Sequence, residues 1–411
     1  MIDLNLLREE PEKTVARILK KDPSFNAQRL HELDQDVRGL RLQVEELRHK
    51  KNELAQAGKK GVTDELRQQS IEVSKKLKEA ESDLEKVEKE FQELYLSCPN
   101  IPAEDIPEGF KESNKVVKEY GKKPTFNFSI KNHVELGTAL GWFDFEAATK
   151  ITGSNFVVYL DDAVKLMYAL TMFMLDNNKK HGFKMVLPPY LVNEKSLYVP
   201  GNFPKFKDQV YAIPEDGFYL IPTAEVALAN LYRDHIFATQ DLPKRLTAWT
   251  GCFRREAGGY GATERGLIRI HEFEKVELFT FCQPEEADKE LERMLVCAEE
   301  LLQQLGLTYR VSLLAAQDCS FPATRTLDIE VWMPGQNAYY EVSSASNCSD
   351  FQARRGAIRY RRSSTSKPEL VYTLNASSLA LPRLMVALME TYQQEDGSIK
   401  IPEILKKYGV W

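Results

Sequence analysis

Residues 252–279 read CFRREAGGYGATERGLIRIHEFEKVELF, and this stretch decides the fold of the chain. The segment WTGCFR at 249–254, which leads into the stretch, and the run 267–281, which ends it, carry β-branched and aromatic residues, and the glycine-rich segment AGGYGA at 257–262 lies between them. Such runs on either side of a glycine-rich turn predict two strands joined by a loop. We therefore expect strands at 249–254 and 267–281.

Charged side chains occupy this predicted pair of strands. Side chains alternate between the two faces of a strand, so Arg269, Phe273 and Glu277 point the same way. Arg254 and Glu256 likewise share a face on the preceding strand. A cation, an aromatic ring and a carboxylate on one face can hold a phosphate, stack on a base and bind a cation. A solvent-facing row of salt bridges is the alternative that these residues alone leave open.

The chain beyond Asn127 alternates short β-rich runs with helical runs. Hairpin connections dominate, a regular βαβ rhythm is missing, and neither G-x-G-x-x-G nor G-x-x-x-x-G-K-[ST] occurs. These features favour an antiparallel β-sheet packed on helices, the α+β class, over a Rossmann or P-loop nucleotide fold. The other expected strands lie at 156–160, at 181–189 and on both sides of a turn at 335–337, and the expected helices lie at 162–181, within 223–234, at 286–306 and from near Ser377 onward.

Residues 27–97 carry a different pattern. Apolar residues recur at alternating steps of three and four in two series, which is the 3.5-residue period of a coiled coil. The segment AGKKGV at 57–62 separates the series, and so short a connection makes the two helices antiparallel neighbours about 45 Å long. The first series is Leu30, Leu33, Val37, Leu40, Val44, Leu47 and Leu54, and the second is Leu66, Val73, Leu77, Ala80, Leu84, Val87, Phe91 and Leu94.

This change of pattern predicts two domains. We expect an N-terminal domain at 1–103 that contains the hairpin, and a second, larger domain at 104–411. The proline-rich segment 98–107 reads as the linker between them.

Charge is distributed unevenly along the predicted hairpin. Residues 38–78 hold eleven basic and six acidic side chains, whereas 79–95 hold seven acids against two lysines. A solvated coiled-coil surface explains this pattern, and so does an arm that contacts a polyphosphate. A homo-oligomeric coiled coil is less favoured, because a closed hairpin already buries its own seam. The candidate contact residues are Arg38, Arg41, Arg48, Lys50, Lys51, Lys59, Lys60, Arg67, Lys75 and Lys76.

Composition excludes several classes of protein. With 55 basic and 61 acidic residues the chain carries a net charge of −6, so any nucleic-acid surface must be local. The sequence contains no run of about 18 apolar residues, so no membrane span is predicted. The acidic start MIDLNLLREEPEK resembles neither a secretory signal nor a transit peptide. The six cysteines form no C-x-x-C pair, so we expect no structural zinc and a cytoplasmic, reducing location.

The stretch 252–279 resembles motif 2 of class II aminoacyl-tRNA synthetases, in the form found in seryl-tRNA synthetases. Other segments agree with this family in the same order along the chain, and together with the hairpin they span nearly all of it. They are NHVELG at 132–137, HGFKMVLPP at 181–189 (motif 1, to Pro188), GNFPKF at 201–206, the T-x-E serine loop at 223–225, YEVSS at 340–344, and TLNASSLALPR at 373–383 (motif 3, to Arg383).

The resemblance implies a reaction. L-Serine and ATP form seryl-adenylate, and serine then passes to the 3′ end of tRNA(Ser), with tRNA(Sec) as a further substrate. Among the residues that match, Arg254 would bind the α-phosphate and the serine carboxylate, and Arg383 the γ-phosphate. Glu256 would contact the adenine, and Phe273 would stack on it beside the backbone of Ile270.

The resemblance also implies a metal site and a serine pocket. Glu341 and Ser344 would bind Mg²⁺ through ATP, although their opposite parity on one strand requires either a strand end or a bulge. Together with Arg254 and Arg383, Glu341 would be catalytic. The remaining implied ATP contacts are Arg255, Arg269, Val342 and Ser343, and the implied serine pocket is Thr223, Ala224, Glu225, Arg254, Glu277, Asn375 and Ser377.

Further partners follow from the same resemblance. The hairpin would reach the long variable arm of the tRNA, and motif 1 would form a homodimer interface. Asn155 stands where the family usually has arginine, which leaves one positioning contact open. Two explanations remain for the basic run at 354–362: a contact with the acceptor stem of the tRNA, or ordinary surface charge.

Three alternatives remain at this stage. A paralogue that only binds a partner would not be expected to keep all of these polar residues. An enzyme that loads a protein carrier would be expected to lack the arm and to carry metal-ligand cysteines. Another class II synthetase, for threonine or proline, would carry a further domain after motif 3, where about 28 residues remain.

Overall fold

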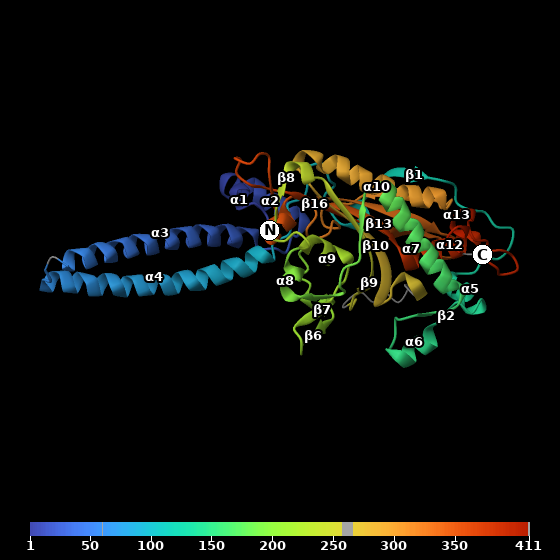
Figure 1. Ribbon diagram of the computed structural model, residues 1–411, viewed down its shortest axis with the longest axis horizontal. Helices are drawn as coiled ribbons and strands as arrows, with labels where there is room; N and C mark the ends of the chain where they lie inside the picture. The colour runs from blue at the N-terminus through green and yellow to red at the C-terminus, as the bar shows by residue number, and fades with distance from the viewer. Residues whose placement is uncertain (60, 257–265, 410–411) are drawn as a thin grey trace. The chain divides into compact units, whose positions relative to one another are not determined.

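The computed structural model describes residues 1–59, 61–256 and 266–409. It divides at Pro99 and Asn100 into an N-terminal helical unit and a C-terminal unit built on a large sheet (Figure 1). Within the described residues, no helix has the length and apolar composition that a bilayer crossing needs.

The N-terminal unit is built on a long helical hairpin. Helix α3 begins after Asn26 and α4 after Thr63, because each of these side chains accepts a backbone N–H of the first turn. The ion pair Arg29–Glu90 joins the start of α3 to the end of α4, and Arg48–Glu81 lies nearer the tip, so the helices are antiparallel as predicted. The helices are α1 (Leu4–Glu9), α2 (Pro11–Lys21), α3 (Ala27–Gly58) and α4 (Asp64–Leu96).

The apolar series form the seam of this hairpin. Val44 of α3 packs with Leu77 and Ala80 of α4, and Leu47 and Leu84 extend the cluster. The predicted 3.5-residue period is therefore the packing period of the pair.

An eight-stranded sheet forms the centre of the C-terminal unit. Six of its seven neighbouring pairs are antiparallel, and only β4 and β9 run parallel. The predicted α+β class is confirmed. In spatial order the strands are β1 (Lys115–Tyr120), β11 (Tyr309–Leu313), β12 (Arg325–Met333), β13 (Ala338–Asn347), β16 (Tyr372–Ala380), β10 (Glu272–Cys282), β9 (Lys244–Phe253) and β4 (Lys184–Val186).

Three helices pack along this sheet: α7 (Asp162–Lys180), α10 (Ala287–Gln304) and α12 (Leu381–Tyr392) (Figure 1). Their apolar residues join a buried core that includes Val276 of β10 and Ile329 of β12. Since side chains alternate along a strand, Phe273, Lys275 and Glu277 of β10 project to the opposite face of the sheet. Further along β10, Phe279 and Phe281 of this face are buried in a second core, so the part of the face around 273–277 is the one left available for a site.

Short elements surround the sheet. The strands are β2 (Phe143–Asp144), β3 (Val158–Tyr159), β5 (Leu191–Asn193), β6 (Ala212–Ile213), β7 (Phe218–Leu220), β8 (Ile236–Ala238), β14 (Arg359–Arg361) and β15 (Glu369–Leu370). The helices are α5 (His133–Ala139), α6 (Phe145–Ile151), α8 (Glu194–Tyr198), α9 (Ala224–Asn230), α11 (Phe351–Gly356) and α13 (Glu403–Lys406).

Several predicted boundaries were wrong, among them the start of the strand expected at 249–254, which begins at Lys244. The last long helix begins at Leu381 rather than near Ser377, because β16 pairs with β10 as far as Ala380 and Pro382 suits the first helical turn. The strand expected from residue 267 begins at Glu272, because a single helical turn, Gly266–Ile268, precedes it. The expected loop at 257–262 lies outside the described residues.

A buried ion pair ties the sheet to α10. Arg245 of β9 donates two hydrogen bonds of 2.6 Å to Glu290, whose side chain is 1% exposed. Arg245→Met should therefore lower the free energy of unfolding by about 3–5 kcal/mol, because it removes both short hydrogen bonds and leaves the buried carboxylate with only the longer ion pair to Arg293 at 3.5 Å. Urea unfolding measures this loss.

The control is Arg362→Met, which removes an exposed ion pair with Glu285 and Glu369. Solvent screens such pairs, so this variant should unfold close to the parent. Equal destabilisation by the two substitutions would contradict the role given to Arg245.

Candidate active site

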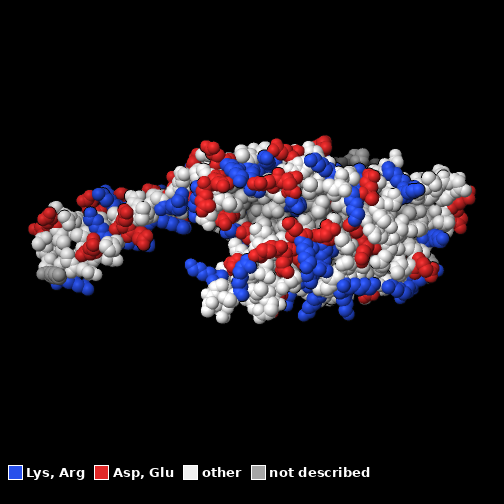
Figure 2. All heavy atoms as spheres, turned by 90° about the horizontal axis from the view of Figure 1, so that it is seen from above, with Lys and Arg blue, Asp and Glu red and all other residues white. Residues whose placement is uncertain are grey.

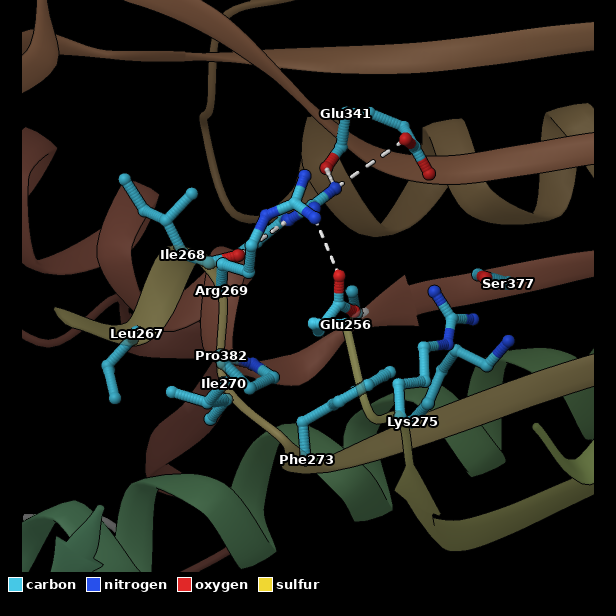
Figure 3. Close-up of a pocket in the computed structure, with 13 residues that line it drawn as sticks. Glu256, Leu267, Ile268, Arg269, Ile270, Phe273, Lys275, Glu341, Ser377 and Pro382 are labelled. Atoms are coloured by element: carbon cyan, nitrogen blue, oxygen red, sulfur yellow. Dashed lines mark hydrogen bonds and ion pairs between the residues drawn. The ribbon is translucent and has the colours of Figure 1, made fainter. Parts of the chain in front are cut away.

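Two adjoining cavities open on the free face of the sheet, with volumes of about 250 and 450 Å³. Five polar or charged residues line both, so the cavities form one continuous site. Figure 3 shows the smaller cavity. The shared residues are Arg254, Glu256, Lys275, Glu341 and Ser377.

The strands bring residues from distant parts of the sequence to this site. Phe273, Lys275 and Glu277 alternate along β10, and Glu277 lies directly opposite Ser377 of β16. A register shift after Val276 makes this pairing, because the opposing strand passes from residue 379 to Ser377. The bulge turns Ser377 towards the cavities.

A second bulge brings Glu341 and Ser344 to one face of β13, where simple alternation would place them on opposite faces. In β13, Ser343 pairs with Ile329 and Glu341 pairs with Glu330, so Val342 is the extra residue. Glu341 and Ser344 consequently both line the larger cavity. A bulge is therefore the feature that lets these two residues share a face.

The smaller cavity is lined by three guanidinium groups and one aromatic ring. Arg254 donates to the carbonyl oxygen of Pro222 at 3.2 Å, and its guanidinium lies 5.2 Å from the centre of the Phe273 ring. Arg269 donates to Glu256 at 2.6 Å (Figure 3). These contacts hold the cations in place at a flat apolar surface.

Arg383 completes this set from the first turn of α12. Its Nη1 donates to the carbonyl oxygen of Glu341 at 2.7 Å, and its Nε donates to that of Ile268 at 3.3 Å. Two carbonyl groups thus position the guanidinium, and the Glu341 carboxylate also lies 3.6 Å from its Nη1. The sequence-predicted residues Arg254, Glu256, Arg269, Ile270, Phe273, Glu341 and Arg383 all line this cavity.

The floor of the larger cavity holds two carboxylates, Glu277 buried and Glu225 partly exposed. Glu277 is 2% exposed, and Lys275 Nζ lies 2.5 Å from its Oε2. Thr223 donates to the same oxygen at 3.2 Å and accepts from Lys275 at 2.8 Å. Burial raises the pKa of Glu277, and Lys275 opposes this shift. Glu277 is therefore a carboxylate with a cation already beside it.

Glu225 is bound differently. Its Oε1 accepts from Gln352 at 2.6 Å and from Asn375 at 3.1 Å, both neutral amides. Burial, and then the nearby charge of Glu277, raise the pKa of Glu225 to about 7. Thr223, Glu225, Glu277, Asn375 and Ser377 all line the larger cavity as expected.

Four predicted site residues do not line either cavity. Ala224 and Val342 are buried in the hydrophobic core. The hydroxyl of Ser343 donates to the carbonyl oxygen of Ser377 at 2.5 Å. The guanidinium of Arg255 lies 5.8 Å from the ring centre of Tyr211. These four residues were predicted because each belongs to a matched motif and lies next in sequence to a residue that does line a cavity.

Sequence analysis missed two residues that contact the carboxylates of the site, Lys275 at Glu277 and Gln352 at Glu225. Lys275 lies on the same face of β10 as Phe273 and Glu277, so alternation along the strand could have predicted it. Gln352 is far from the motifs in sequence and reaches Glu225 only through the fold. Asn155, the departure from the family pattern, has φ 60°, which asparagine tolerates, and its carbonyl oxygen accepts from His271 N–H at 2.9 Å.

Among the described residues, no group of three or more His, Cys, Asp or Glu side chains has the arrangement of a metal site. Glu341 and Ser344 nevertheless present oxygen atoms to one cavity, and Mg²⁺ bound through phosphates needs only one or two protein oxygen ligands. The residues present therefore fit a magnesium ion delivered with a nucleotide.

Comparison with known proteins identifies the family. The family description "Seryl-tRNA synthetase N-terminal domain" matches residues 1–102, and "tRNA synthetase class II core domain (G, H, P, S and T)" matches 206–392. A serine–tRNA ligase of Chlamydia abortus is 44% identical over 99% of this chain and 98% of its own length. The chain belongs to the seryl-tRNA synthetase family.

Solved structures of this family agree over the whole chain. Seryl-tRNA synthetase from Pyrococcus horikoshii, complexed with ATP, superposes with a TM-score of 0.94 at 35% identity, covering 100% of this chain and 98% of that one. The cytoplasmic serine–tRNA ligase of Naegleria fowleri, complexed with AMP, gives 0.87 at 25% identity, covering 100% and 97%. The predicted family, fold and enzyme class, an aminoacyl-tRNA ligase, are confirmed.

Glu225→Gln should gain stability relative to the parent as the pH rises. The folded-state pKa of about 7 lies above the ordinary 4.5, so the folded chain binds the extra proton between these values. The stability that this carboxyl contributes is full below about pH 4.5 and is lost as the pH rises through 7. Glutamine does not titrate.

Urea unfolding across this pH range measures the effect. The difference in free energy of unfolding between variant and parent should grow by up to about 3 kcal/mol in favour of the variant. A difference that is independent of pH would contradict the shifted pKa.

Proposed function

We propose that this site binds ATP and L-serine, joins them as seryl-adenylate, and transfers serine to the 3′ end of tRNA(Ser), with tRNA(Sec) as a second substrate. One observation supports this most strongly. A cavity of guanidinium groups beside an aromatic ring adjoins a cavity with the carboxylates of Glu225 and Glu277 on its floor, and Arg254 lines both.

ATP suits the smaller cavity. The Phe273 ring offers a stacking surface for adenine, and the backbone of Ile270 lies beside it. Arg254 is placed for the α-phosphate and Arg383 for the γ-phosphate, as the matched motifs imply. The ATP complex of the Pyrococcus horikoshii relative supports this assignment.

Glu341 and Ser344 would hold the magnesium ion that accompanies ATP. When bound, the ion supplies positive charge against the phosphate oxygens. The charge of Arg383 is available near the same place, since its Nη1 lies 3.6 Å from the Glu341 carboxylate.

Each of the two carboxylates would bind a different group of serine. Glu277 already has Lys275 beside it, so it suits the neutral hydroxyl as a hydrogen-bond acceptor. Glu225 makes no ion pair with any described residue, so it suits the ammonium. Alanine keeps the ammonium but lacks the hydroxyl, so the hydrogen bond that Glu277 would accept is lost, a penalty that supports discrimination of about 10⁴ or more.

The reaction needs no protein base, because the serine carboxylate is already an anion. Its obstacle is the approach of this anion to a phosphorus atom within a polyanion. Arg254 lies between the two cavities, where it offsets the repulsion and stabilises the charge of the transition state. The strands fix the in-line geometry.

The helical hairpin supplies a surface for tRNA. Acidic and basic side chains both cover it (Figure 2). Four of the predicted contact residues form ion pairs within the hairpin: Arg38, Arg41, Arg48 and Lys76. For five exposed ones no ion pair with another described residue is found: Lys50, Lys51, Lys59, Arg67 and Lys75. Lys60 lies outside the described residues.

These five cations are the stronger candidates for binding phosphates of the long variable arm. The basic run at 354–362 is a weaker candidate, because Arg354 pairs with Asp350 and Arg362 with Glu285. Ordinary surface charge therefore remains the better explanation of that run.

We also propose a homodimer that works in the cytoplasm. Large apolar side chains are exposed on α7 and in the motif 1 region that follows it. They are Tyr168, Met172, Met185, Leu187 and Leu191. A surface of this kind is typical of a protein interface.

Arg254→Ala should retain the fold and lose ATP–pyrophosphate exchange with serine by about 10²–10³-fold, because it removes a donor to the transition state. The control is Arg361→Ala, an exposed arginine of β14 outside both cavities, which should exchange at the parental rate. Near-normal exchange by Arg254→Ala would contradict the assignment.

Deletion of residues 30–95 should separate the two half-reactions. Serine-dependent exchange should stay near that of the full chain, whereas tRNA charging should fall by about 10³-fold or more, because several phosphate contacts are lost. Equal loss of both activities would contradict a separate role for the hairpin.

A finer version of this experiment replaces Lys50, Lys51 and Lys75 by alanine. The slope of log affinity for tRNA against log salt should fall by about one for each phosphate contact removed. Lys86→Ala and Lys89→Ala, at the acidic base of the hairpin, are the matched controls.

A further inference from the structure

Gln352 lies in α11, outside every motif that predicted the site, yet it contacts the site's least compensated carboxylate. Its side chain is fully buried. Its Nε2 donates to Glu225 Oε1 at 2.6 Å and, at 3.3 Å, to the carbonyl oxygen of Pro200. Its Oε1 accepts the Thr373 hydroxyl at 2.8 Å.

The surrounding groups fix the orientation of this amide. The Thr373 hydroxyl donates its proton to Gln352 Oε1, while the opposite end meets two acceptors. A flipped amide would place its oxygen against a carboxylate and a carbonyl, and both hydrogen bonds would be lost. Gln352 is thus held as a donor towards Glu225.

One face of β16 organises the whole contact. Thr373, Asn375 and Ser377 alternate along this strand, so they share a face. Thr373 holds Gln352, Asn375 donates to Glu225 Oε1, and Ser377 lines the cavity. Both amide donors therefore bind the same oxygen of Glu225.

The second oxygen of Glu225 is left for another partner. Among the described residues none donates to Oε2, and Glu225 lines the larger cavity. Two donors on Oε1 also restrict rotation of the carboxylate, which otherwise could offer either oxygen at a range of angles.

We propose that Gln352 is a positioning residue for amino-acid recognition: it fixes Glu225 so that Oε2 meets the substrate ammonium. This rests on the proposed function, in which Glu225 binds the ammonium of serine. Gln352 acts through Glu225, and Thr373 acts through Gln352. The adenine and phosphate cavity contains neither residue.

The proposal has a consequence for pH dependence. The amide of Gln352 stabilises the ionised form of Glu225, against the burial and the charge of Glu277 that raise its pKa. Lys275 and Arg254 also favour the ionised form, and they remain in any Gln352 variant. Loss of the amide therefore raises this pKa further, and serine binding weakens already at a higher pH.

The experiment is ATP–pyrophosphate exchange by the full chain carrying Gln352→Met, which keeps the length of the side chain but removes its donor. The KM for serine should rise by about 10–100-fold, as expected for a lost hydrogen bond to a charged group. The KM for ATP should stay unchanged. The pH below which the serine KM rises should shift upward relative to the parent.

Matched variants separate positioning from general damage. Gln393→Met also removes a buried amide, one that bonds Lys131 and Glu390 away from both cavities, so it should lose thermal stability without changing the serine KM. Thr373→Val should give a smaller rise in the serine KM, and Thr373→Ser should restore the parental value. These two variants keep the test available if Gln352→Met does not fold.

Two results would overturn the proposal. One is a serine KM that Gln352→Met and Thr373→Val leave unchanged, and the other is an equal rise in the KM values for serine and ATP without a shift of the pH profile. Failure of the proposed function is a separate result, because the unmodified chain would then show no serine-dependent exchange.

Discussion

The placement of two carboxylates on the same floor, Glu277 buried and Glu225 partly exposed, is the constraint on which the site depends. Both line the larger cavity, with Lys275 as the cation beside Glu277. Removing a carboxylate from water is costly unless a partner compensates it, and Glu277 already has one. Glu225 makes no ion pair with a described residue, and in the proposed function the ammonium group of serine supplies this partner.

The sheet makes such a site possible because its bulges redirect side chains. One extra residue in β16 turns Ser377 towards Glu277, and one in β13 places Glu341 and Ser344 on the same side. The opposite face of the same strands packs on helices, so the site rests on a rigid base. Catalysis by charge placement requires such rigidity, because misplaced cations lose most of their effect.

Regular patterns in the sequence predicted the parts of the structure that are regular. The apolar series through Val44 and Leu77 revealed the hairpin, and alternation along one strand placed Phe273 with Glu277. Register and bulges depend on pairing between distant strands, so the true start of the last helix was missed. Gln352 escaped for the same reason, since only the folded chain brings it to Glu225. Lys275, in contrast, could have been predicted from alternation along the strand alone.

The central claim is that one amino acid completes the site by its ammonium and its hydroxyl together. ATP–pyrophosphate exchange, measured with each of the twenty amino acids singly, tests it most directly. The account predicts exchange with serine, and with alanine weaker by about 10⁴-fold. Exchange with alanine at a comparable rate, or with a different amino acid in place of serine, would contradict it.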